Sequence, residues 1–224
     1  MTQPALLDIV SSAEGTFYGG LSADDRVTWV AWRAFEGACA TGTVDELMAA
    51  AYAYMEMSPA HRIETACVLG AFLLARGKAR EALPVFSLAV ENLLGAADYQ
   101  PTIINALIGR AAAHLADGRA HAAVADAAAA AEMHFAQPDF YVGDSNPFGG
   151  PGWFAQMIPT YPISATLREL KALEDFATPA LRGRLIFMEY VATGAENQIL
   201  LRAAQKLLGD DPLLRDFQEL NNGI

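Results

Sequence analysis

The sequence is poor in cysteine and in positive charge. Its only cysteines are Cys39 and Cys67, which cannot build a disulfide framework, and we expect both to be small buried side chains within helices. Lysine and arginine total 15, against 26 aspartate and glutamate residues, so the formal net charge is −11. Nucleic acids and anionic membranes repel such a chain, which argues against either as its main ligand.

Two targeting features are also missing. No apolar run approaches the ~20 residues that a helix needs to cross a bilayer. The amino-terminal stretch MTQPALLDIVSS lacks the basic region that begins a secretory signal. We therefore expect a cytoplasmic protein that makes no membrane contact. Apolar residues form 53% of the chain and charged ones 18%, a balance typical of a chain with a packed core.

An internal repeat marked by glycines is the main positive feature. Within Ala66–Ala89, apolar and small residues recur at helical spacing on both sides of Gly77. The helix before this turn carries Gly70, and the helix after it carries Ala82 and Phe86. Small residues let two antiparallel helices approach closely, and a glycine supplies the left-handed turn between them. This stretch predicts a tight helical hairpin.

The same frame recurs upstream around Gly42 and downstream around Gly118. Gly42 and Gly77 lie 35 residues apart, and Gly77 and Gly118 lie 41 apart. Upstream, Phe35 stands where a small residue is expected. The pattern resembles the tetratricopeptide repeat, a helix pair of about 34 residues. The resemblance implies three units, at Thr28–His61, Ile63–Ala96 and Ile104–Gln137.

The resemblance implies an all-α fold, an α-solenoid of antiparallel helix pairs with C-terminal capping helices. Generic helical hairpins are the alternative. We expect a lead-in over residues 1–27 with a helix near Pro4–Ser11, three helix pairs over 28–137, a loop rich in glycine, proline and aromatics over 138–162, and C-terminal helices of the same domain over 163–224.

Boundary signals refine the two ends of the chain. Ser22, followed by Asp25, is typical of an N-cap and predicts the start of the first repeat helix there. The C-terminal helices are expected near Ser164–Phe176, Pro179–Thr193 and Glu196–Leu208, and a short last helix should open at 210–212.

No side-chain constellation predicts catalysis, a metal site or a cofactor site. The string 143–146, Gly-Asp-Ser-Asn, resembles the nucleophile block of the GDSL/SGNH hydrolases, whose histidine base lies downstream. The last histidine of this chain, His134, lies upstream of Ser145, and turn chemistry accounts for the string. His114 and His121 straddle a turn, with no carboxylate or cysteine at ligand spacing.

A binding surface is the remaining prediction. In tetratricopeptide arrays the first helix of each pair lines a concave face, and that face lacks lysine and arginine here. An apolar groove suits an apolar helix or an extended peptide. The chain's own C-terminal helices filling the groove is an equal alternative. The resemblance places six partner-binding residues on this face: Trp29, Trp32, Glu36, Glu64, Asn105 and Ile108.

Three functions of different classes follow. We favour a non-catalytic protein-binding scaffold, a bacterial adaptor or chaperone-like protein that holds a peptide or partner helix. In outline it resembles the small acidic repeat chaperones of secretion systems. The second hypothesis is an enzyme or small-ligand-binding protein with a pocket beside the 138–162 loop. The third is a structural homo-oligomer subunit that self-associates through its alanine-rich helices.

Overall fold

A computed structural model describes residues 23–93, 100–135, 163–173, 175–192 and 197–215. All regular structure in these ranges is helical, and no strand occurs in them, which confirms the predicted all-α class. The elements are α2 (Ala23–Thr41), α3 (Val44–Met57), the 3-10 turn η1 (Pro59–His61), α4 (Arg62–Ala75), α5 (Ala79–Leu93), α6 (Gln100–Ala116), α7 (Ala120–Phe135), α9 (Ile163–Ala172), α10 (Pro179–Ala192) and α11 (Gln198–Leu208).

Two of the predicted turn glycines end their helices in the expected way. Gly77 and Gly118 have φ angles of 70° and 76°, the left-handed region that favours glycine. The residue after each glycine donates its backbone N–H to the carbonyl five residues earlier. Lys78 donates to Leu73, and Arg119 donates to His114, both at 2.8 Å. This is the Schellman pattern, which satisfies helix-end carbonyls and reverses the chain. The sequence prediction of both turns is confirmed.

Gly42 marks a turn for a different reason. Its φ angle is not positive, so the left-handed turn expected there is wrong. Its N–H still donates to the Ala38 carbonyl at 3.0 Å, and a Cβ at Gly42 would lie 2.8 Å from the Ala38 Cα and oxygen. A close backbone approach therefore requires glycine here. The next helix then begins with a capping box, in which Thr43 and Glu46 exchange backbone-to-side-chain hydrogen bonds.

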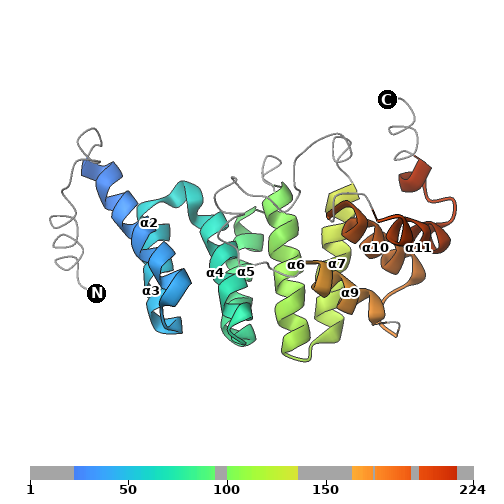
Figure 1. Cartoon of the computed structure of the whole chain (residues 1–224), viewed down its shortest axis with the longest axis horizontal. Coiled ribbons are helices and arrows are strands. Elements are labelled where there is room, and N and C mark those ends of the chain that lie inside the picture. The colour runs from blue at the N-terminus through green and yellow to red at the C-terminus, as the bar shows by residue number, and fades with distance from the viewer. Residues whose placement is uncertain (1–22, 94–99, 136–162, 174, 193–196, 216–224) are drawn as a thin grey trace.

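The helices pack neighbour to neighbour along the long axis of the molecule (Figure 1). Within pairs, α2 packs on α3, α4 on α5, and α6 on α7. Between pairs, α3 packs on α4 and α5 on α6, and α4 also contacts α6 directly. One continuous apolar core runs through these helices and reaches α9 and α10. Phe35, which departs from the repeat pattern, is fully buried in it.

The C-terminal helices extend this arrangement. Helix α9 packs on α6 and α10, and α10 packs on α7 and α11 (Figure 1). A second, smaller core around Phe187 and Leu208 joins α10 to α11. The substantial packing of α9, α10 and α11 in the described ranges is on α6, α7 and one another. One of the three first helices, α6, thus contacts a C-terminal helix, whereas α2 and α4 have no substantial packing on one.

Helix boundaries differ modestly from the sequence predictions. Helix α2 is described from Ala23, in agreement with the start predicted at Ser22 and ahead of Thr28, where the repeat unit was placed. Helix α6 begins at Gln100, ahead of Ile104. Helix α9 ends at Ala172, short of the predicted Phe176. The short last helix is present at 212–215, where the Asp211 side chain accepts from the Leu213 N–H at 3.1 Å.

Several predicted features lie outside the described residues: the Pro4–Ser11 helix, Ser22, the whole 138–162 loop, Thr193 and Glu196. Across the ranges that are described, no helix is both long enough and apolar enough to cross a membrane.

Candidate functional site

The predicted partner-binding residues lie on the first helix of each pair, α2, α4 and α6. Five of them, Trp29, Trp32, Glu36, Glu64 and Asn105, are partly exposed. The sixth, Ile108, is 0% exposed and belongs to the core, because α6 packs on both α4 and α5. It cannot contact a partner in this fold. We call the five remaining residues the first-helix face.

Trp32 supports the core as well as this face. Its ring meets Phe35 edge-on at 5.8 Å and Tyr54 at 5.3 Å between centroids. Tyr54 in turn stacks on His61 at 6.3 Å. Helices α2 and α3 and the turn before α4 thus share one aromatic cluster, defined by Trp32, Phe35, Tyr54 and His61. Aromatic pairs at such distances stabilise beyond their buried area. Replacing Trp32 will therefore disturb the fold as well as the surface.

Trp29 and Glu36 both contact Arg33, a residue that the tetratricopeptide resemblance did not place on this face. The Arg33 guanidinium lies over the Trp29 ring, 6.0 Å from its centroid. The same guanidinium forms an ion pair with Glu36 one turn along the helix. The expectation that this face carries no arginine or lysine is therefore wrong, since Arg33 folds onto it. The charge of Glu36 is already balanced within the chain.

The environment of Glu64 differs from that of Glu36. It stands in the first turn of α4, where the helix dipole favours an acid. Its Oε2 atom is buried and has no hydrogen-bond partner in the described part of the chain. Burial, with the Glu64 charge adding to it, raises the pKa of the Cys67 thiol to about 12. Among the described residues, Glu64 is thus an acid of the first-helix face with a buried carboxylate oxygen that receives no hydrogen bond.

The two cysteines have no reactive character. Both are buried, and neither forms a disulfide. Burial raises the pKa of Cys39 to about 12, as it does for Cys67, so neither thiolate forms near neutral pH. The prediction of small buried residues is confirmed.

A polar cluster between α5, α6 and α7 was not predicted. The Arg110 guanidinium donates to both carboxylate oxygens of Asp126, at 2.9 and 2.7 Å, and to the Ser87 hydroxyl at 3.3 Å. His114 lies 3.7 Å from the same carboxylate, and burial lowers its pKa. The sequence signal for this cluster was Asp126, a single charged residue within a run of alanines that was expected to pack closely on neighbouring helices. The cluster links three helices through hydrogen bonds and an ion pair.

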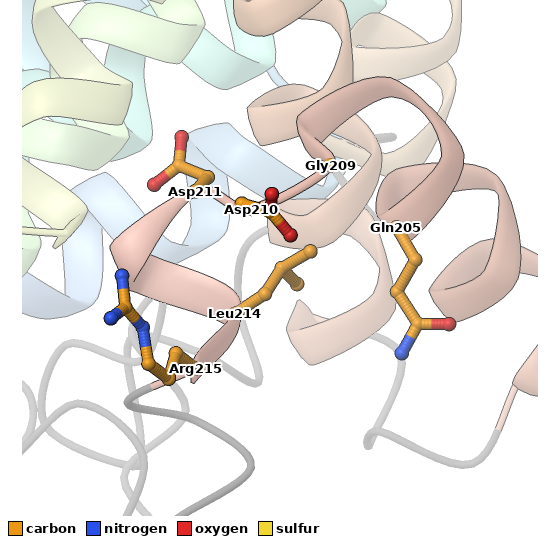
Figure 2. A pocket seen from close by; sticks show the side chains of 6 residues that line it. All are labelled: Gln205, Gly209, Asp210, Asp211, Leu214 and Arg215. Carbon is orange, nitrogen blue, oxygen red and sulfur yellow. The ribbon is translucent and has the colours of Figure 1, made fainter.

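One hollow, of about 750 Å³, lies at the C-terminal end of the described chain (Figure 2). Asp210 and Leu214 lie at its centre, while Gln205 and Arg215 lie on opposite sides and do not converge on one point (Figure 2). Asp211, also in the lining, is used to cap the last turn and lies 3.6 Å from Arg184. The arrangement does not single out a ligand.

One serine–histidine contact occurs near the start of α4. Ser58 Oγ and His61 Nδ1 are 2.7 Å apart, but Ser58 is only 8% exposed and this bond closes the turn before α4. No group of three or more histidine, cysteine, aspartate or glutamate residues in the described ranges could hold a metal ion. The 143–146 string lies outside those ranges.

No protein-family model, curated protein or solved structure matches the chain.

Proposed function

We propose that this chain is a non-catalytic protein-binding scaffold that holds a peptide or helix of a partner protein against its first helices, α2 and α4. An adaptor or chaperone-like role is the form that this function takes. The observation that carries the proposal is the first-helix face, where Trp29 and Trp32 remain partly exposed beside two acids on helices fixed by a continuous core.

The proposal includes the repeat architecture. Three helix pairs follow one another, and the first helices α4 and α6 touch. A fourth pair, α9 with α10, continues the order, and α11 closes it. Nearest-neighbour packing of this kind is typical of α-solenoids, in which the first helices of a tetratricopeptide-like array share one surface. That surface would be the binding face.

Exposed tryptophan on a rigid helix supports binding energetically. Tryptophan is enriched among the few residues that dominate protein–protein affinity, because a large apolar side chain loses water on contact without losing much rotamer freedom. A helix already held by its core adds little ordering cost on association. An apolar helix or extended segment is the partner that such a face accepts.

The test compares single substitutions of two aromatic side chains, Trp29, which is partly exposed, and Tyr52, which is exposed. Trp29→Ala removes a ring from the first-helix face, whereas Tyr52→Ala removes one from the outer side of α3, where Tyr52 is 43% exposed. Trp32→Ala is a poor choice, because that ring packs on Phe35 and Tyr54. We expect affinity capture with quantitative mass spectrometry to lose its specific proteins with Trp29→Ala and keep them with Tyr52→Ala.

Thermal unfolding of both variants provides the control for folding. If Trp29→Ala unfolds like the wild type and still captures the same proteins, the first-helix face is not the binding surface and the proposal fails.

A further inference from the structure

Glu64 presents a physical anomaly on the first-helix face. A buried carboxylate oxygen with no hydrogen-bond donor costs free energy, and nearly all buried polar atoms in folded proteins have a partner. Oε2 of Glu64 has none in the described part of the chain, although the residue as a whole is partly exposed. The start of α4 tolerates the charge through the helix dipole but supplies no donor to this oxygen.

The aromatic cluster begins three residues before this acid, at His61, the N-cap residue of α4. Glu64 and Cys67 are one turn apart on α4, and the Glu64 charge acts on both Cys67 and Tyr54. Tyr54 is the common neighbour that links the acid to the aromatic cluster, since its ring contacts Trp32 at 5.3 Å and stacks on His61 at 6.3 Å. The Glu64 carboxylate therefore lies near a cluster in which Trp32 and His61 are partly exposed, while Phe35 and Tyr54 are buried.

The chain already shows how such a combination holds a cation. Arg33 places its guanidinium over the Trp29 ring while pairing with the Glu36 carboxylate. Cations bind both to aromatic faces and to carboxylates, and the two attractions add when water is partly excluded. On the same face, no described residue pairs with the Glu64 carboxylate in this way.

We infer that this site binds a lysine or arginine side chain of the partner, with Glu64 as the specificity-determining residue and the aromatic cluster as the wall beside it. The inference rests on the proposed function and names the partner's chemistry: an apolar segment that carries one basic residue. The net charge of −11 favours the approach of such a segment.

The first experiment selects random displayed 12-residue peptides on the immobilised full chain. Wild-type protein should enrich apolar peptides with at least one lysine or arginine. Glu64→Gln keeps the shape of the side chain and removes its charge, so it should still enrich apolar peptides but lose the basic preference. Glu56→Gln removes the same charge from the exposed outer side of α3 and should keep that preference.

The second experiment measures coupling with one selected peptide and its lysine-to-norleucine analogue, by isothermal calorimetry. Norleucine should weaken binding to wild type by about tenfold and to Glu64→Gln by less than about twofold. If norleucine weakens binding equally in the two proteins, the inference is wrong but the scaffold function is not contradicted. The same holds if the wild-type chain enriches apolar peptides that carry no basic residue. Failure of any peptide to be enriched would overturn both proposals. Self-association that Glu64→Gln abolishes would identify a second copy as the occupant and overturn the inference.

Discussion

The ring of Phe86 lies directly against Gly109, so that a Cβ at position 109 would overlap its Cε1 and Cζ atoms. Phe86 belongs to α5 and Gly109 to α6. On the other side, a Cβ at Gly70 of α4 would lie 2.6 Å from the same ring. Two glycines on successive first helices thus make room for one buried phenylalanine ring. This explains how α4 and α6 come close enough to touch while α5 packs on both.

The first prediction concerns the contact of the Phe86 ring with these two glycines. Gly109→Ala should lower the free energy of unfolding by about 1–3 kcal/mol, because the added methyl group displaces a ring held by the core. Gly70→Ala should act in the same direction. Urea denaturation monitored by far-ultraviolet circular dichroism measures the effect.

Gly37→Ala is the matched control for that prediction. It also replaces a glycine within a helix, but a Cβ there meets nothing within 4 Å. Better helix propensity should leave this variant unchanged or more stable by up to ~1 kcal/mol. A loss at Gly37 as large as that at Gly109 would show that helix backbone effects, not the ring, determine the result.

The second prediction separates two kinds of turn glycine. At Gly118 the φ angle is 76°, so Gly118→Ala should cost about 1–2 kcal/mol and Gly118→Asn distinctly less, since asparagine tolerates left-handed backbone. At Gly42 the obstacle is the Ala38 backbone, 2.8 Å from any added Cβ. Gly42→Ala and Gly42→Asn should therefore be equally harmful. Thermal melts of the four variants decide it, and a rescue by asparagine at Gly42 would contradict the explanation.

The third prediction concerns the ion pair of Arg110 and Asp126. Asp126→Leu alone leaves the guanidinium without its bidentate partner in a largely apolar setting and should cost about 2–4 kcal/mol. The double variant Arg110→Met with Asp126→Leu removes both charges and should recover much of that loss. Guanidinium denaturation of both single variants and the double variant forms the cycle. Strict additivity of the two single losses would show that the pair is not coupled.

The fourth prediction is a pH dependence caused by His134. The side chain is 0% exposed, and burial lowers its pKa from 6.5 to about 3. Below about pH 6.5 the unfolded chain therefore takes up a proton that the folded chain does not. Stability should be full above that pH and fall toward pH 3, by up to ~1.4 kcal/mol per pH unit. His114, whose pKa is also lowered by burial, adds in the same direction.

The measurement is chemical denaturation between about pH 7 and pH 5, a window above the usual carboxylate range. His134→Leu should flatten the slope of stability against pH. Phe135→Leu, which loosens the neighbouring contact with Phe187 but removes no titrating group, should keep the wild-type slope. An unchanged slope in His134→Leu would show that another group accounts for the dependence.

Much of the fold followed from local signals. Gly77 and Gly118 predicted their turns, because few residues other than glycine adopt positive φ at low cost. The short helix at 212–215 followed from the capping chemistry of Asp211. Gly42 failed as a left-handed turn because a glycine can be required by close approach as well as by backbone angle, and the sequence does not distinguish the two causes.

The binding face was harder to predict. Five of the six predicted residues are partly exposed, but Ile108 is buried. The tetratricopeptide pattern gives the position of a residue along a helix, but not how deeply that helix lies among its neighbours. Arg33 was overlooked because its Cα stands beside the face and only its long side chain reaches over it.

By itself, then, the sequence determined the helical class, the hairpin turns and the buried thiols, because helix periodicity, caps and left-handed glycines are properties of a few neighbouring residues. Tertiary structure alone decided the surroundings of Glu64 on the first-helix face. Arg33 neutralises Glu36 within one helix, whereas the surroundings of Glu64 come from α2, α3 and α4 together. Electrostatic balance depends on distances through space, and segments far apart in the chain set those distances only when the helices pack.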